Sequence, residues 1–513
     1  MPAGRAVKTA TRPNGAVLMT ARFVVGHRAG RHVLIENGEV VFDDGAIVFV
    51  GRGYGGPVAR RIDYGLALIG PGFVDLDALA DLDTTILSYD NQPAWQKGRV
   101  WPRDYIDSGP AEMYSRTQLR FQKRHAFAGL IRNGITTALP IASLFYRAWG
   151  ETVEEFTDAA EEAAALGLRV YLGPAYRTGN QVVDEDGTIG TYYQEALGLE
   201  ELAGAIVFCE RMEGAAGGLV RTMLSPDRIE TCTPELMRRI AAAGRALGVP
   251  VRQHACQSKT EYALVLAQHG MSPPEWMASL GYLTERTLLP HGTYVSGSRH
   301  ITRPGRDLEI IRDSGATIVH CPLVSGRGGG AIDHFGRYKE MGLKIGLGTD
   351  TAPADLVANM QIGMILARVM AGNPLAVRSE DYYDAATLGG ADALGRPDLG
   401  RLAPGARADI TVFDLDRPHT GQVIDPIQTM LLTGHGRDFS TVVIDGRFVM
   451  ENRIIPDSDE AADNTRAQAQ FEHVMAQYPR RTLNHPPAGA IFSSSYPVDW
   501  ADAGPRLWGQ PGA

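Results

Sequence analysis

Short apolar segments alternate with segments of helical periodicity through the middle of this 513-residue chain. The apolar segments have the length of buried strands, and strands that alternate with helices form βαβ units and a parallel sheet. The eight strand candidates are Ile69–Asp77, Ile135–Leu139, Arg169–Tyr176, Arg221–Pro226, Val249–Ala255, Thr287–His291, Ala316–Pro322 and Lys344–Asp350. Eight such units predict an α/β protein built on a (β/α)8 barrel of the TIM type, in which chemistry lies at the carboxyl ends of the strands.

Helices are predicted between these strands, where apolar residues recur at helical spacing. Four such segments are Ser115–Asn133, Glu154–Leu166, Pro234–Leu247 and Gly305–Ser314, and a glycine directly follows each of them. Glycine commonly ends a helix because it adopts the left-handed conformation without strain.

The two ends of the chain carry a different pattern. From Val17 to about Leu68, apolar and polar residues alternate, and Asn37-Gly38 and Asp44-Gly45 stand where tight turns are expected. A similar pattern recurs at 408–414 and 441–450. We therefore expect the two ends to form one discontinuous β-rich domain around the barrel, with parts at residues 1–68 and 399–455 and the barrel at 69–398.

The last part, residues 456–513, begins with a helix-like segment to Tyr478 and then becomes rich in Pro, Gly and Ser. We interpret 486–513 as an extended arm that packs on a neighbouring subunit, which predicts a homo-oligomer, most simply a dimer.

Charge and cysteine content narrow the class of partner. The net charge is −9, and acidic and basic residues are interspersed, which argues against nucleic acid and favours a small molecule. The four cysteines are far apart and form no C-x-x-C pair, as expected of a reducing, cytoplasmic location. No run approaches the roughly 18 apolar residues that a membrane span needs.

Polar side chains stand at the ends of four of the predicted strands: His254, His291, His320 and Asp350. A single strand-end histidine is more often a hydrogen-bonded structural residue than a ligand. Four such groups together are the donors that a divalent ion such as Zn²⁺ takes, with a position left for water. The ion lowers the pKa of that water, and a nearby carboxylate can accept its proton.

The first strand ends in an acidic stretch, Asp75 to Asp83. If the strand continues that far, Asp75, Asp77 and Leu79 share one face and point toward the barrel axis. Asp77 is then a candidate ligand; alternatively it is a solvated loop residue or an acceptor for a neighbouring histidine.

Nine short motifs, in order over about residues 17–455, resemble the amidohydrolase superfamily in its branch of triazine hydrolases (chlorohydrolase-like) and aminohydrolases (deaminase-like). They are Pro71-Gly-Phe-Val-Asp75, Gly134-Ile-Thr-Thr137, Cys232-Thr-Pro-Glu-Leu236, His254-Ala-Cys-Gln257, Leu289-Pro-His291, Val319-His-Cys-Pro322, Gly346-Leu-Gly-Thr-Asp350, Ala386-Thr-Leu-Gly-Gly-Ala391, and Gly400-Arg-Leu-Ala-Pro-Gly405 followed by Ala408-Asp409. The resemblance implies a metal-bearing barrel flanked by a small β-sandwich built from both chain ends. By the same match, His254 and Asp350 are metal ligands, His291 orients water or becomes a ligand, and Asp350 also accepts a proton.

The chain also departs from that family. The usual strand-one His-x-His pair is replaced by Asp77-Ala78-Leu79, and Gln257 stands where a proton-shuttling Glu is usual. A glutamine can form hydrogen bonds but cannot exchange protons in this way. The common Pro-His after strand four reads Pro226-Asp227, and the Ser-Asn after strand seven reads Val324-Ser325. No lysine stands at the end of strand four for carbamylation, which fits one metal ion rather than two.

These observations predict a hydrolase of C–N bonds in small, cyclic, nitrogen-containing compounds, with one divalent ion held by Asp77, His254, His291 and Asp350. Zn²⁺ is the first choice, and the additional carboxylate also suits Fe²⁺, Mn²⁺ or Co²⁺. Two alternatives remain: a barrel with metal-free or lyase-like acid–base chemistry, and a non-catalytic barrel that binds a ligand.

The expected substrate contacts come from loops after the strands. Trp95 lies in a long loop after strand one and suits a flat, nitrogen-rich ring, although it could equally pack a subunit interface. The other predicted substrate-binding residues are Gln257, His320, Tyr176, Asp227 and Arg228.

Overall fold

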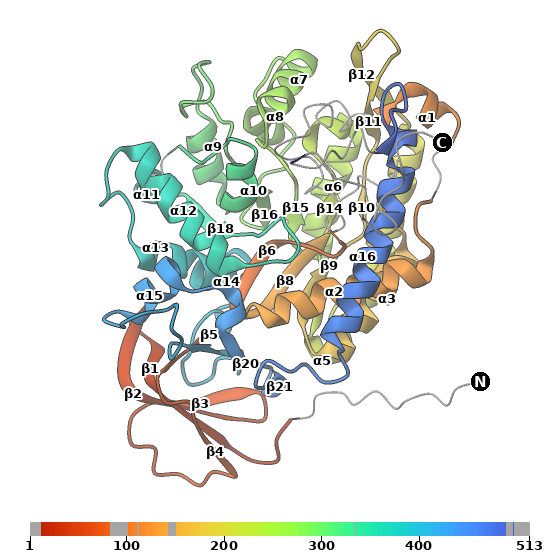
Figure 1. Cartoon of the computed structure of the whole chain (residues 1–513). Helices are drawn as coiled ribbons and strands as arrows, with labels where there is room; N and C mark the ends of the chain where they lie inside the picture. The colour runs from red at the N-terminus through yellow and green to blue at the C-terminus, as the bar shows by residue number, and fades with distance from the viewer. Residues whose placement is uncertain are drawn as a thin grey trace, which may run out of the picture.

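A computed structural model describes residues 12–82, 101–109, 112–141, 150–333, 335–488 and 496. Eight parallel strands form its centre as two four-stranded sheets (Figure 1). The first contains β6 (Phe73–Leu79), β8 (Ile135–Ile141), β9 (Arg169–Leu172) and β13 (Val220–Thr222), and the second contains β15 (Val251–Arg252), β16 (Thr287–Pro290), β17 (Thr317–His320) and β18 (Lys344–Leu347).

Backbone hydrogen bonds join the two sheets at both edges. Arg252 N donates to Leu224 O at 2.9 Å, and Asp350 N donates to Asp77 O at 2.7 Å. The eight strands therefore follow one another in chain order, as in a (β/α)8 barrel, and their carboxyl ends face one side.

Helices lie outside these strands, and the four predicted from the sequence are present. They are α2 (Arg116–Arg132), α3 (Val153–Leu166), α6 (Pro234–Leu247) and α9 (Asp307–Ser314). Side-chain caps explain the starts of the first three. Ser115 forms a capping box with Gln118, Thr152 accepts from Glu155 N, and Thr233 accepts from Leu236 N before a proline at the first helical position.

Further helices complete the outer layer and connect it to the strands. Their bounds are α1 (Arg103–Asp107), α4 (Glu195–Met212), α5 (Ala215–Gly218), α7 (Lys259–His269), α8 (Pro273–Ser279), α10 (Pro322–Arg327), α11 (Phe335–Glu340), α12 (Leu356–Ala371), α13 (Ser379–Asp384), α14 (Gly390–Ala393) and α15 (Pro426–Thr433). Three short strands, β7 (Trp101–Pro102), β11 (Gly179–Val183) and β12 (Ile189–Tyr193), form a separate small sheet.

The predicted first strand, Ile69–Asp77, is wrong as a single element. It consists of β5 (Ala67–Pro71), which belongs to another sheet, and β6, which belongs to the barrel. The chain changes sheets at Gly72, where a Cβ atom would lie 2.1 Å from the Thr136 side chain. The close approach requires glycine at this point.

Strands from both chain ends share one eight-stranded sheet, in the order β21-β20-β19-β5-β1-β2-β3 with β4 beside β1. Its other members are β1 (Val17–Arg28), β2 (Arg31–Asp43), β3 (Ala46–Gly51), β4 (Arg60–Asp63), β19 (Ile410–Asp414), β20 (Phe439–Ile444) and β21 (Arg447–Met450). The turn expected at Asn37-Gly38 is wrong, because both residues lie inside β2. The turn before β2 is at Ala29-Gly30 instead, and Asp44-Gly45 does connect β2 to β3.

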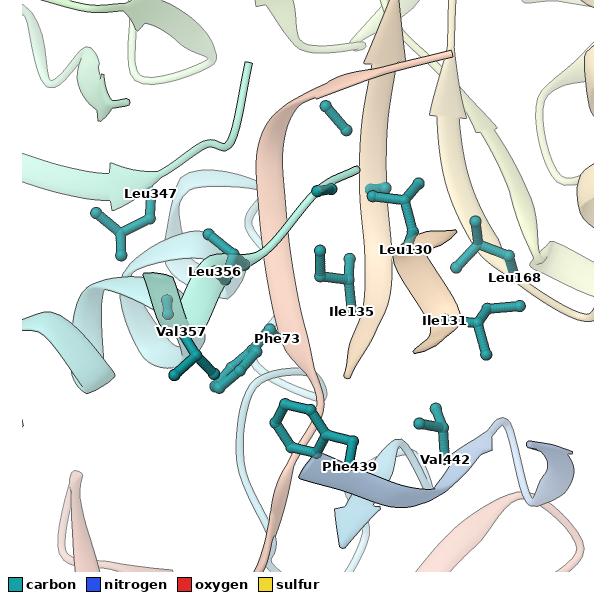
Figure 2. Packing of buried hydrophobic residues seen from close by; sticks show 14 of the residues in the cluster. Phe73, Leu130, Ile131, Ile135, Leu168, Leu347, Leu356, Val357, Phe439 and Val442 are labelled. Carbon is teal, nitrogen blue, oxygen red and sulfur yellow. The ribbon is translucent and has the colours of Figure 1, made fainter. Parts of the chain in front are cut away.

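An apolar core joins this sheet to the barrel. Figure 2 shows Phe73 and Ile135, from the first two barrel strands, packed with residues of α2 and β20. The ring of Phe73 meets the ring of Phe439 edge to face, with centroids 5.5 Å apart. Burial of these side chains ties the barrel strands to the sheet below them.

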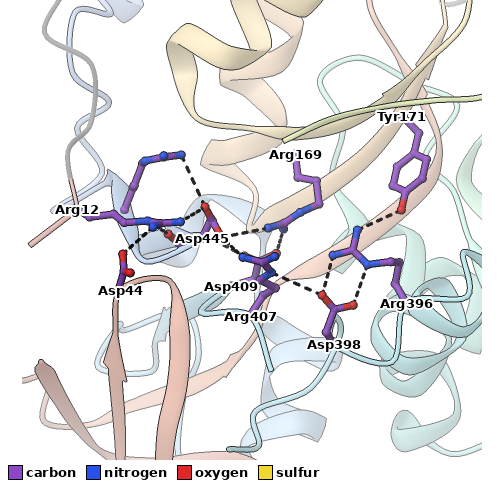
Figure 3. A network of polar contacts seen from close by, with 10 residues as sticks. Arg12, Asp44, Arg169, Tyr171, Arg396, Asp398, Arg407, Asp409 and Asp445 are labelled. Atoms are coloured by element: carbon purple, nitrogen blue, oxygen red, sulfur yellow. Dashed lines mark hydrogen bonds and ion pairs between the residues drawn. The ribbon is translucent and has the colours of Figure 1, made fainter. Parts of the chain in front are cut away.

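A polar network reinforces the same junction (Figure 3). Arg169, at the start of β9, pairs with Asp409, and Asp409 Oδ1 accepts from Asp445 N at 2.8 Å. Arg407 Nη1 binds Asp445 Oδ1 at 2.9 Å. Asp409, which belongs to one of the family-like motifs, therefore has a structural role far from the strand ends that carry the candidate site.

The beginning of the C-terminal part packs on this chain's own barrel. Helix α16 (Glu460–Gln477) lies against α2, where Gln122 Nε2 donates to Gln470 Oε1 at 3.0 Å. The arm expected at 486–513 lies outside the described residues, except for 486–488 and Tyr496. None of the helices in the described ranges has the length and apolar character needed to cross a bilayer.

Candidate metal centre

Three predicted ligands meet at the carboxyl ends of the barrel strands. Asp77 comes from β6, His254 follows β15 and His291 follows β16. One potential ligand atom of each lies within 4.8 Å of the others, and all three residues are buried. The His254 Nε2 and Asp77 Oδ2 atoms are 3.5 Å apart, and the two imidazole centroids are 5.4 Å apart.

Asp350 stands beside this group. Its Oδ2 lies 3.6 Å from His291 Nε2, while its backbone N binds Asp77 O. His291, Asp350 and Cys256 all have positive φ values, of 76°, 45° and 60°. Such conformations are costly for residues other than glycine and cluster at functional sites, so the backbone here is shaped to aim these side chains.

Asp77 is fully buried, and the solvated-loop alternative is therefore wrong. A buried arginine that the sequence analysis missed, Arg252, holds one of its oxygens: Nη1 lies 3.2 Å from Asp77 Oδ1, and both side chains are 0% exposed. Arg252 also donates to Leu139 O at 2.6 Å and to Ser225 Oγ at 2.7 Å. Its position two residues before His254, on the same face of strand five, was the signal available in the sequence.

The charge state of Asp77 follows from these neighbours. Burial alone would raise the pKa of this carboxyl, but its interaction and hydrogen bond with His254 and the positive charge of Arg252 lower it to about 2. Asp77 is therefore an ionised acceptor with Oδ1 on Arg252 and Oδ2 turned toward His254.

The two strand-end histidines after β16 and β17 are neutral. Burial lowers the pKa of His291 to about 3, helped by the neighbouring imidazole of His254, and lowers the pKa of His320 to about 3 as well. His320 packs beside the rings of Phe335 and Tyr382, with centroids 5.9 and 6.2 Å away, and does not belong to the three-residue group. A neutral imidazole is the form that coordinates a metal.

Asp75 has a different role from Asp77. Its carboxylate accepts hydrogen bonds from Thr349 N at 3.0 Å and Thr349 Oγ1 at 2.6 Å, which ties β6 to the end of β18. Burial raises its pKa to about 6 despite these bonds. Asp75 thus helps to close the barrel next to the ligands.

The predicted substrate-binding residues lie in different environments. Asp227 pairs with Arg177 at 2.8 Å, and Arg228 Nε lies 3.5 Å from Glu230 Oε1. Gln257 is half-buried and donates from its backbone N to Glu261 Oε2 at 2.8 Å. Tyr176 is 1% exposed and packs in the apolar core, while Trp95 lies outside the described residues.

Two buried acids, Glu230 and Glu261, were not anticipated from the sequence. Glu261 is 3% exposed and accepts from the backbone N atoms of Cys256 at 2.6 Å and Gln257 at 2.8 Å. Glu230 is 4% exposed and receives a hydrogen bond from Gln181 Nε2 at 3.4 Å. No spacing rule connects Glu230 to His254, because the two meet only when strands four and five lie side by side.

The donor set fits a divalent metal ion. The Nε2 atom of His291 is buried and makes no hydrogen bond within the described ranges, and Oδ2 of Asp77 faces His254 rather than Arg252. Two imidazole nitrogens and a carboxylate oxygen are ligands for Zn²⁺ and related ions. The guanidinium of Arg252 supplies a positive charge that opposes the ion, and the second carboxylate at Asp350 offsets it.

Curated relatives and solved structures are similar to most of the chain. It is 26% identical over 461 residues to the 5-methylthioadenosine/S-adenosylhomocysteine deaminase of Natronomonas pharaonis, covering 88% of this chain and 97% of that protein. The enzyme of the same name from Halobacterium salinarum is 28% identical over 452 residues, with 86% and 95% covered.

Two zinc-bound crystal structures share the fold. One is an adenosine deaminase from Xanthomonas campestris, with a TM-score of 0.73, 20% identity and 89% and 98% of the two chains covered. The other is an atrazine chlorohydrolase from Arthrobacter aurescens, with a TM-score of 0.74, 20% identity and 89% and 100% covered. The profile described as Amidohydrolase family matches residues 94–449, which is more than half of the chain. The protein therefore belongs to the amidohydrolase family.

Proposed function

We propose that this protein is a metal-dependent hydrolase that cleaves a C–N bond, or the bond to a halogen, on a small nitrogen heterocycle. The observation that carries the proposal is the buried group of Asp77, His254 and His291 at the carboxyl ends of three barrel strands, with Asp350 next to it. This is the side of the barrel where such enzymes perform chemistry.

When bound, a divalent ion lowers the pKa of a water molecule toward neutrality and polarises the bond under attack. We assign Asp77, His254, His291 and Asp350 to hold it, with Zn²⁺ as the first choice and Fe²⁺, Mn²⁺ or Co²⁺ as alternatives. Asp350 has a second task, since its carboxylate can accept the proton of the attacking water. Arg252 acts as a positioning residue that holds Asp77 Oδ1 and so fixes which oxygen faces the histidines.

The substrate class comes from the relatives. Their names describe deaminases of 5-methylthioadenosine and S-adenosylhomocysteine, a deaminase of adenosine and a chlorohydrolase of atrazine. We infer a planar purine-like or triazine-like ring that bears an amino or halo substituent. Gln257, His320, Trp95, Tyr176, Asp227 and Arg228 are proposed to contact it.

Metal analysis and variants test this assignment. Protein purified without chelators is expected to contain about one equivalent of a transition metal, and His254→Ala, Asp77→Ala and Asp350→Ala to lose most of it while remaining folded. His473→Ala, at an exposed histidine of α16, is the matched control and keeps the metal. Metal content unchanged in the three site variants would refute the centre.

Activity is assayed as release of ammonia or halide from amino- and halo-substituted purines, purine nucleosides and triazines. The wild type is expected to turn over at least one of them, and removal of the metal by a chelator to abolish that turnover. Turnover that persists in chelated protein would refute metal dependence.

A specific observation favours a second candidate function, metal-free acid–base chemistry by the same group of residues. Arg252 already places a fixed positive charge 3.2 Å from Asp77, where a cation would otherwise be needed. Under this alternative His254, His291, His320, Asp227 and Asp350 are the acid and base groups, and activity survives complete removal of metal.

The expected homodimer is also a proposal. We infer that the arm at 486–513 contacts the partner, and a variant truncated after Arg481 is then expected to elute as a monomer in size-exclusion chromatography. An unchanged elution volume would refute this role of the arm.

A further inference from the structure

Hydrolysis of a C–N bond requires a proton for the leaving nitrogen, because an amide anion is a very poor leaving group. The residue three positions after His254, Gln257, has no proton to give. Asp350, whose Oδ2 lies 3.6 Å from His291 Nε2, is already assigned to accept the proton of water. A second group with an exchangeable proton is therefore needed near the same centre.

Glu230 lies close to this centre, although it follows strand four rather than strand five. The backbone N of Ile229 donates to His254 O at 3.0 Å, so the segment that carries Glu230 is hydrogen-bonded to the residue that supplies a ligand. The Glu230 side chain is 4% exposed, and its Oε2 atom has no hydrogen-bond partner in the described part of the chain. Burial of an unpartnered carboxyl oxygen at this depth costs free energy, and catalytic groups are among the exceptions that native proteins keep.

Glu261 lies close enough to Glu230 for the charge of Glu230 to affect its ionisation. Burial raises the pKa of both carboxyls, and the charge of Glu230 raises that of Glu261 further. Two carboxyls buried near each other disfavour the state in which both are ionised. Glu261 uses its two oxygens to accept from Cys256 N and Gln257 N, so the oxygen available to donate a proton is Oε2 of Glu230.

The other charged groups around Glu230 support this assignment. Burial and Asp227 raise the pKa of Glu230, while Arg228 and His254 lower it. Asp227 itself is bound by Arg177 at 2.8 Å, and its pKa is lowered by the charges of Arg177 and Arg228, which outweigh burial. Asp227 is therefore held as an ionised partner of an arginine and is a poor proton donor.

We propose that Glu230 is the catalytic acid that protonates the leaving nitrogen, in place of the carboxyl that Gln257 lacks. The inference rests on the proposed hydrolytic function. In the balanced step, water loses a proton to Asp350 and forms the new C–O bond. The C–N bond then breaks as Glu230 Oε2 transfers its proton to nitrogen, so that an amine or ammonia leaves. The Asp350 proton restores the Glu230 acid before the next turnover.

A pair of substrates separates this role from a structural one. An amino substituent needs a proton to leave, whereas chloride leaves without one. We expect Glu230→Gln to lower kcat for an aminopurine nucleoside by about 10²–10⁴-fold, the usual range for a general acid. The same variant is expected to change kcat for the matching chloropurine nucleoside by less than about fivefold, with metal content unchanged.

Rescue and control variants complete the experiment. Glu230→Gln combined with Gln257→Glu moves the carboxyl to the strand-five position. The double variant is expected to deaminate with a kcat at least about tenfold above that of Glu230→Gln alone. Glu235→Gln, at a more exposed glutamate of α6 paired with Arg239, is the matched control and leaves both reactions unchanged. Infrared difference spectra at neutral pH are expected to show a protonated carboxyl band that disappears in Glu230→Gln.

Three results would overturn the proposal. They are deamination by Glu230→Gln within about threefold of wild type, an equal loss for the amino and chloro substrates, and a protonated carboxyl band that survives the substitution. A wild type that hydrolyses neither substrate class would instead refute the proposed function together with this inference, so the two failures are distinguishable.

Discussion

The buried pair of Arg252 and Asp77 gives the sharpest prediction about stability. Both side chains are fully buried, and Arg252 Nη1 lies 3.2 Å from Asp77 Oδ1. At an effective dielectric constant of roughly 20, two unit charges at this distance attract each other by about 5 kcal/mol before desolvation is subtracted. Removal of one partner leaves the other charge buried without compensation, which costs about 3–5 kcal/mol. We expect Arg252→Met to destabilise the metal-free protein by that amount.

A double-mutant cycle measures the interaction itself. Asp77→Asn removes the charge with little change in shape, so Arg252→Met in the Asp77→Asn background is expected to cost about 2–3 kcal/mol less than in the wild type. Urea unfolding followed by circular dichroism, on chelator-treated protein, gives the four free energies of the cycle. A coupling free energy below about 0.5 kcal/mol would refute the view that the arginine serves mainly to neutralise Asp77.

Two further predictions concern the barrel junction and the buried acids. Gly72→Ala places a Cβ atom 2.1 Å from the Thr136 side chain, so we expect overpacking to lower the free energy of unfolding by about 1–3 kcal/mol. Gly55→Ala is the control and should change that free energy little, because no atom lies within 4 Å of the added Cβ. Equal urea midpoints for the two variants would contradict the close approach at Gly72. Burial raises the pKa of Glu230, and it raises that of Glu261 from 4.5 to about 8, so the folded pair of carboxyls holds a proton that the unfolded chain loses. Wild-type stability should therefore fall as the pH rises across this window. Urea midpoints at about pH 5 and pH 8 should differ less for Glu261→Gln than for the wild type, and identical pH dependence would show that this carboxyl does not titrate there.

Much of the fold was predictable because its signals are local. The helices over 116–132, 153–166 and 234–247 begin at Ser or Thr caps and end before a glycine, and each signal acts within one turn of the chain. The errors arose where local signals compete with tertiary contacts. Asn37-Gly38 has the composition of a turn, yet pairing with β1 keeps β2 continuous through it. The run from Ile69 to Asp77 passes the break signal Pro71-Gly72, but only the tertiary contacts show that its two halves belong to different sheets.

The candidate site was also predictable only in part. The order of strands and the period of two within each strand were sufficient to place Asp77, His254, His291 and Asp350 at one end of a barrel, because the carboxyl ends of parallel strands face one side. Only the tertiary structure revealed that Arg252 pairs with Asp77, that Glu230 lies near His254, and that Glu261 lies near Glu230. The sequence therefore determined which groups can meet at the strand ends. Packing across strands and burial away from water decided their charge states, because ionisation depends on distances and burial that the spacing of residues along the chain does not encode.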